Sequence, residues 1–161
     1  MLEEQEKKKM MMTEAPRMSS RAERAPMDSR SFAIEAARLL QDTKCTDITV
    51  LEVRGLSSVC DYIIVASGTS DRQMKTVRRD LEDLGDELGH DAFRADTDAD
   101  STWIIVDFVD VVVNLFEPNL RAYYDLEGLW SDAQRISWER PEGERPMPRL
   151  VRDSDDNDAS E

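Results

Sequence analysis

Residues 102–130 constrain the fold of this chain more than any other stretch. They contain two runs rich in Val, Ile and aromatic residues, 102–108 and 110–117. Such residues favour pleated and half-buried backbone, so both runs are predicted to be β-strands. Only two residues separate Asp107 from Asp110, a spacing typical of a tight hairpin in which the two aspartates lie opposite each other.

Side chains alternate along a strand, which assigns the residues of this hairpin to two faces. One face is entirely apolar and is predicted to be core: Ile104, Val106, Val111, Val113 and Leu115. The second face mixes aromatic, aliphatic and polar residues: Trp103, Ile105, Asp107, Asp110, Val112, Asn114 and Phe116.

A helix is predicted to begin at Pro118, because proline ends a strand and is well accommodated in the first turn of a helix. The pattern continues at spacings of three and four residues through Leu120, Tyr123, Tyr124, Glu127 and Trp130. Such spacing places these side chains on one side of a helix. That side therefore combines aromatic residues with a carboxylate.

Two separated motifs resemble the ribosomal silencing factor family, also called RsfS or Iojap. They are DYIIVASGTSDRQM at residues 61–74 and WIIVDFVDVVVNLFEPNLRAYYDLEGLW at residues 103–130. The resemblance covers about residues 32–138. It implies a fold similar to that of nucleotidyltransferases. It also implies binding to the large ribosomal subunit through its ribosomal protein fourteen, which hinders joining of the small subunit.

The sequence departs from the family pattern at two places. The family usually has Gly where Val109 stands, and His where Asn114 and Met74, or its neighbour Gln73, stand. Valine is poorly suited to a positive φ, which a primed hairpin turn would require at residue 109.

The length of 161 residues suits one domain with charged extensions. Residues 1–27 carry six basic and five acidic side chains, and residues 139–161 carry four and eight. Since the whole chain has a net charge of −14, residues 28–138 carry −11. We expect a disordered N-terminal extension over 1–27, one folded domain over 28–138 and a disordered acidic tail over 139–161.

The strong negative charge predicts a basic protein surface as the partner. An acidic domain gains nothing from releasing counterions from phosphates, so little direct nucleic-acid binding is expected. No apolar run reaches the length of a membrane helix. The two cysteines, Cys45 and Cys60, are expected to be free and buried in a cytoplasmic protein. The sequence leaves open whether the protein is a monomer or a homodimer.

The rest of the chain predicts an α/β fold. Helices are expected over 28–43 and 70–88, strands over 47–53 and 61–67, and a short strand over 91–95. The strand at 61–67 is apolar on both faces and is predicted to be central. The predicted architecture is a single mixed sheet of about five strands with about three packing helices, similar to nucleotidyltransferases.

A turn formed by Gly68, Thr69 and Ser70 lies between the predicted central strand and the following helix. Free N–H groups at a helix start are a weak candidate for an anion site. A plain structural turn is the favoured interpretation, because the glycine signature of a phosphate loop is missing and Asp71 adds negative charge. No cofactor and no metal site are predicted.

Three functions follow as hypotheses. The first is a silencing factor without catalytic activity, which would bind its partner through the mixed hairpin face and the third helix: Trp103, Asp107, Asp110, Asn114, Tyr124, Glu127 and Trp130. The second is a Mg²⁺-dependent nucleotidyltransferase that uses Asp107 and Asp110 as metal ligands and residues 68–70 for phosphate. The third, a small RNA-binding module, is disfavoured by the charge.

Overall fold

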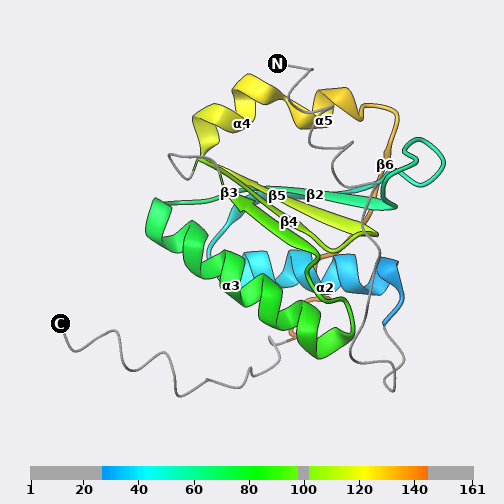
Figure 1. Cartoon of the computed structure of the whole chain (residues 1–161), viewed down its shortest axis with the longest axis horizontal. Coiled ribbons are helices and arrows are strands. Elements are labelled where there is room, and N and C mark those ends of the chain that lie inside the picture. Colours follow the sequence, from blue (N-terminus) through cyan, green and yellow to red (C-terminus); the bar gives the residue numbers. More distant parts are fainter. Residues whose placement is uncertain (1–26, 98–101, 145–161) are drawn as a thin grey trace.

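The computed structural model of the chain describes residues 27–97 and 102–144. They form one β-sheet with α2 and α3 on one face and the short helices α4 and α5 on the other (Figure 1). The elements in chain order are α2 (Ser29–Asp42), β1 (Thr46–Glu52), β2 (Tyr62–Ser67), α3 (Asp71–Leu88), β3 (Arg94–Thr97), β4 (Trp103–Asp107), β5 (Val111–Phe116), α4 (Pro118–Tyr124), α5 (Leu126–Leu129) and β6 (Gln134–Arg135).

The sheet has the strand order β3-β4-β5-β2-β1-β6. Strand β2 pairs in parallel with β5, and the other neighbouring pairs are antiparallel. The predicted mixed α/β sheet is confirmed, with one strand more than expected because β6 forms after α5. The short third strand is at Arg94–Thr97 rather than at 91–95. The likeness to nucleotidyltransferases within this fold class stays a prediction.

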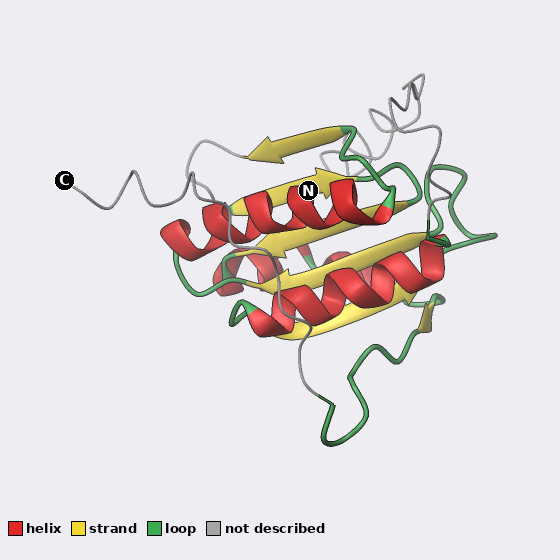
Figure 2. Cartoon of the chain, turned by 90° about the horizontal axis from the view of Figure 1, so that it is seen from below, coloured by secondary structure: helices red, strands yellow, loops and turns green. Residues whose placement is uncertain are grey.

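The first two predicted helices are confirmed, and their ends show why they form there. Asp28 caps α2 by accepting a hydrogen bond from the Ser31 N–H, and Ser70 caps α3 by accepting one from the Gln73 N–H. Gly89 ends α3 in the left-handed conformation. Helices α2 and α3 lie side by side across one face of the sheet (Figure 2).

The residues of the hairpin divide between two faces as predicted, but both faces are buried in a core, whereas a core was predicted for only one of them. The face that holds Ile104 and Val113 packs under α2 and α3. The opposite face, with Trp103 and Phe116, packs under α4 and α5. Both predicted cysteines are free and buried, and burial raises the pKa of the Cys45 thiol.

The predicted pairing of Asp107 with Asp110 is wrong. Asp107 lies opposite Val112, so the turn is shifted by one residue along the chain. Its centre is Val109, whose φ is 74°. The Asp110 N–H donates to the Phe108 carbonyl over 3.0 Å, which closes a three-residue γ-turn, a strained conformation for a β-branched residue.

The prediction of one continuous helix from Pro118 to Trp130 is also wrong. Asp125 adopts a left-handed conformation with φ 44° and divides the predicted helix into α4 and α5. Its carboxylate accepts a hydrogen bond from the Gly128 N–H, so one residue ends the first helix and begins the second. Tyr124 and Glu127 are therefore not one turn apart on a continuous helix.

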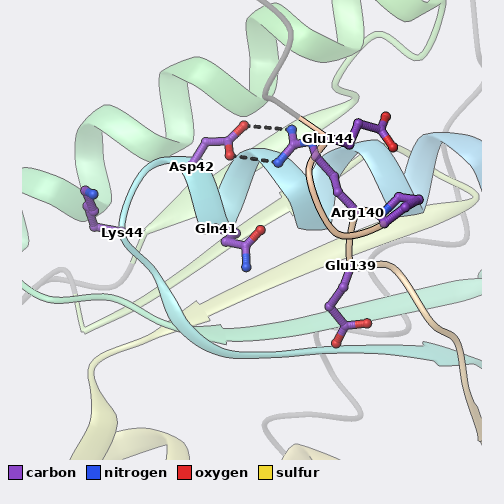
Figure 3. A pocket seen from close by; sticks show the side chains of 7 residues that line it. Gln41, Asp42, Lys44, Glu139, Arg140 and Glu144 are labelled. Carbon is purple, nitrogen blue, oxygen red and sulfur yellow. Dashed lines mark hydrogen bonds and ion pairs between the residues drawn. The ribbon is translucent and has the colours of Figure 1, made fainter.

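The C-terminal part of the described chain returns to α2. The Trp138 indole donates to the Ile48 carbonyl over 3.2 Å, and the Arg140 guanidinium donates two hydrogen bonds of 2.9 Å to Asp42. Glu144 lies in the same region, where a pocket of about 600 Å³ opens (Figure 3). The disorder expected for 1–27 and 139–161 stays a prediction, since most of these residues lie outside the described part.

Candidate partner-binding surface

An aromatic cluster joins the hairpin to α4. The Trp103 ring lies 4.8 Å from the Phe116 ring and 4.6 Å from the Tyr124 ring, measured between centroids. Tyr123 meets the Tyr124 ring edge-on at 5.3 Å. The cluster therefore extends from the covered face of the sheet to the outside of the molecule, where Tyr123 is 58% exposed.

Asn114 holds the inner end of this cluster. Its side-chain oxygen accepts a hydrogen bond of 3.1 Å from the Trp103 indole N–H, and both residues are buried. A buried indole needs such an acceptor, since leaving the N–H unsatisfied would cost about 1–3 kcal/mol. Asn114 therefore fixes the orientation of Trp103 beneath Tyr124.

The seven predicted site residues divide by exposure. Trp103, Asp107 and Asn114 are almost completely buried, so in this structure they lie beneath the surface. The other four are partly exposed: Asp110, Tyr124, Glu127 and Trp130. The structure thus brings Trp103, Asn114 and Tyr124 together, while Asp107 and Asp110 lie in the hairpin turn.

Glu127 is engaged inside the protein. Its carboxylate accepts a hydrogen bond of 3.0 Å from the Arg121 Nε and one of 3.5 Å from the Thr49 hydroxyl, and it forms an ion pair with the Arg121 guanidinium at 2.9 Å. Arg121 in turn donates to the Ser67 hydroxyl over 2.9 Å. This network connects α4 and α5 with β1 and β2. The sequence did not predict Arg121 as the partner of Glu127. The two residues are six positions apart, and they meet only because the chain turns at Asp125.

Each aspartate of the hairpin has a local structural contact. Asp107 accepts a hydrogen bond of 2.7 Å from the Val109 N–H, and Asp110 accepts one of 3.3 Å from the Ser29 hydroxyl. Asp107 is completely buried. Across residues 27–97 and 102–144, no group of three or more His, Cys, Asp and Glu side chains is placed to hold a metal ion.

The turn at Gly68, Thr69 and Ser70 also has internal contacts. The Gly68 N–H donates to the Phe116 carbonyl over 2.8 Å, and the Thr69 N–H donates to the Gln73 side chain over 3.0 Å. A side chain at position 68 would collide with Met74, which explains the glycine by packing. Two N–H groups that an anion would use are thus already bonded.

We define the α4–α5 surface as Tyr123, Tyr124, Asp125 and Trp130. It combines aromatic side chains with negative charge, the combination that was predicted for the partner-binding face. Tyr123 and Asp125 are the exposed members, and the predicted site lacked both. The helical spacing of the sequence did include Tyr123, but spacing alone does not show how exposed a side chain is.

Among the described residues, no helix has both the length and the apolar character to cross a membrane.

The chain matches the family model described as ribosomal silencing factor during starvation over residues 26–161. It is 36% identical over 107 residues to the ribosomal silencing factor RsfS of Bacillus subtilis, covering 66% of this chain and 91% of that protein. It is 35% identical over 106 residues to the chloroplastic protein Iojap of Zea mays, covering 66% of this chain and 46% of that protein.

A solved crystal structure has a fold similar to that of this chain. The crystal structure of a Chromobacterium violaceum protein superposes with a TM-score of 0.62 at 32% sequence identity, covering 73% of this chain and 97% of that one. Family model, relatives and fold agree with the two motifs at residues 61–74 and 103–130. This chain belongs to the ribosomal silencing factor family, RsfS or Iojap.

Proposed function

We propose that this protein binds the large ribosomal subunit through its ribosomal protein fourteen and thereby blocks joining of the small subunit. The match to the silencing factor family over residues 26–161 carries this proposal. The protein represses translation by occupying a surface, so no catalytic step is required of it.

The charge of the chain supports a protein partner. Its net charge is −14, and a basic ribosomal protein complements an acidic surface and accelerates association. Protein fourteen is therefore proposed as the direct partner, in the cytoplasm. Whether the free protein is a monomer or a homodimer is decided by analytical ultracentrifugation.

The α4–α5 surface is the proposed contact. Tyr123 projects into solvent, and Tyr124 lies between it and the buried Trp103. Exposed aromatic residues on a rigid support are the residues that most often dominate binding energy at interfaces. In this arrangement Trp103 and Asn114 act from beneath, by holding Tyr124, while Asp110 lies at the hairpin turn.

A subunit-joining assay tests the proposal. Purified large subunits are incubated with the protein, small subunits are added, and the intact ribosomes are quantified by light scattering. Joining should fall in proportion to the large subunits occupied, and Tyr123→Ala should restore it at the same protein concentration. Full joining at saturating wild-type protein would contradict the proposal.

A further inference from the structure

Helix α3 has an uneven distribution of charge along its length. The first nine residues, 71–79, hold four basic side chains and one acidic one, Asp71. The remaining nine, 80–88, hold acidic side chains and no basic ones. The basic residues are Arg72, Lys75, Arg78 and Arg79, and the acidic ones that follow are Asp80, Glu82, Asp83, Asp86 and Glu87.

This order opposes the electrostatics of the helix itself. The N-terminal end of a helix carries partial positive charge and its C-terminal end carries partial negative charge. Basic side chains therefore stabilise a helix near its C-terminus, and acidic side chains stabilise it near its N-terminus. Asp71 alone follows that rule in the first turn, and the last turn contains no basic residue. A sequence that breaks a local stability rule is expected where function requires it.

Three of the basic side chains lie on one exposed face. Arg72, Lys75 and Arg79 are separated by three and four residues, which places them on one side of the helix, and all three are exposed. We call them the basic stripe. Within residues 27–97 and 102–144, Arg72 and Arg79 make no ion pair. Lys75 pairs with Asp71 at 3.2 Å, but both side chains are more than half exposed, so solvent screens the pair.

The stripe suits a row of phosphates. It extends over two helical turns, a distance of about 10 Å, which is longer than a single small anion. Two of its three cations are arginines, whose planar guanidinium groups bind phosphate oxygens in a bidentate manner. A ribosomal subunit exposes RNA backbone beside its proteins, whereas the net charge of −14 disfavours binding to RNA free in solution.

The position of the stripe allows it to contact the same ribosomal surface as α4. Strands β2 and β5 run in parallel, and the Gly68 N–H at the end of β2 donates to the Phe116 carbonyl at the end of β5. Helices α3 and α4 therefore begin at the same end of the sheet (Figure 1). A partner that covers α4 can reach Arg72 across this end.

We propose that Arg72, Lys75 and Arg79 form a second contact of this protein, which binds the phosphate backbone of ribosomal RNA next to the protein that α4 and α5 contact. This inference rests on the proposed function, since it requires the large subunit as partner. The RNA contact orients the protein on the subunit and adds affinity, while the α4–α5 surface supplies recognition of the protein.

Binding to purified large subunits at increasing KCl concentrations tests this contact. The triple variant Arg72→Gln, Lys75→Gln, Arg79→Gln is compared with a control of equal charge change, Arg30→Gln, Lys44→Gln, Arg54→Gln. The stripe variant should bind about tenfold more weakly, because each exposed ion contact contributes little alone. Its slope of log affinity against log salt should be smaller by about 2, since each lost phosphate contact removes about 0.7 to 0.9.

The control variant should keep the wild-type slope. The thermal midpoint of the stripe variant should equal or exceed that of the wild type, because the removed charges oppose the helix dipole. Wild-type affinity and slope in the stripe variant would overturn the RNA contact while leaving the proposed function intact. Absence of binding by the wild type itself would overturn both.

Crosslinking identifies the class of partner. Thr76 is exposed between Lys75 and Arg79, so Thr76→Cys can carry a photoactivated crosslinker, while Cys45 and Cys60 are buried. Irradiation of the complex with large subunits should give a product that is shortened by ribonuclease. A product that only protease shortens would show that the stripe faces a ribosomal protein and would overturn the RNA assignment.

Discussion

The Arg121 guanidinium lies 2.9 Å from the Glu127 carboxylate, and this ion pair spans the break between α4 and α5. The two side chains are only 12% and 25% exposed, so the pair is shielded from much of the solvent screening that weakens surface pairs. It joins the two short helices, which carry the α4–α5 surface, and the hydrogen bonds of the same two side chains with Ser67 and Thr49 connect them to the sheet.

Glu127→Gln should lower the free energy of unfolding by about 1 to 2 kcal/mol, because it leaves the poorly exposed Arg121 without its carboxylate. Urea denaturation followed by circular dichroism measures this. The matched control is Asp61→Asn, which removes the exposed pair of Asp61 with Arg54 at 3.6 Å and should cost less than about 0.5 kcal/mol. Equal losses in both variants would show that the Arg121 pair has no special role.

Val109→Gly should stabilise the protein. The positive φ of 74° strains valine by about 1–3 kcal/mol, and glycine adopts it without strain at an entropic cost of about 0.5–1 kcal/mol. The expected net gain is about 1 kcal/mol in chemical denaturation. Val59→Gly, at a position with negative φ and similar exposure, should destabilise instead. A loss of stability in Val109→Gly would mean that the γ-turn is not strained.

The sequence predicted the elements whose signals are local. Helix α3 was predicted because Ser70, Gln73 and Gly89 give both caps, and β2 because its apolar run fits a central strand. The register of the hairpin was not predictable, because it depends on Val109 adopting a conformation that valine rarely adopts. The pattern correctly placed Trp103 on the face of the hairpin opposite that of Ile104 and Val113.

The candidate site was predictable only in part, because exposure depends on packing. Periodicity put Tyr123, Tyr124 and Glu127 on one helix, whereas the left-handed conformation of Asp125 turns the chain and gives Glu127 an internal partner. No spacing rule reveals that Trp103 is covered. The exposed tyrosine was therefore outside the predicted site and the buried tryptophan was inside it.

Gly85→Ala should destabilise the protein by about 1–3 kcal/mol. In an exposed helix the same change would stabilise by about 1 kcal/mol, but here a Cβ would collide with the His90 carbonyl and the Phe108 ring. The sign of the change therefore tests the packing of α3 against the hairpin. The exposed control Thr76→Ala should change stability little. An increase in thermal midpoint for Gly85→Ala would contradict the close approach.

The thiol of Cys45 should react slowly in the folded protein. Burial raises the pKa of this thiol, which reduces the reactive thiolate at neutral pH, and the side chain is only 6% exposed. Reaction with a chromogenic disulfide should therefore be slow for both buried cysteines in buffer and fast in denaturant. Rapid reaction of Cys45 in native buffer would show that α2 and the following turn open readily.

The affinity of Tyr123→Ala for purified large ribosomal subunits tests the central claim most directly. Tyr123 is 58% exposed, so its loss should leave folding intact, and its matched control is Leu56→Ala, since Leu56 is 51% exposed in the loop between β1 and β2. A dominant interface aromatic contributes about 2 kcal/mol or more, so Tyr123→Ala should bind roughly thirtyfold more weakly. Leu56→Ala should bind like the wild type. Wild-type affinity in Tyr123→Ala, or an equal loss in Leu56→Ala, would contradict the α4–α5 surface as the ribosome-binding face.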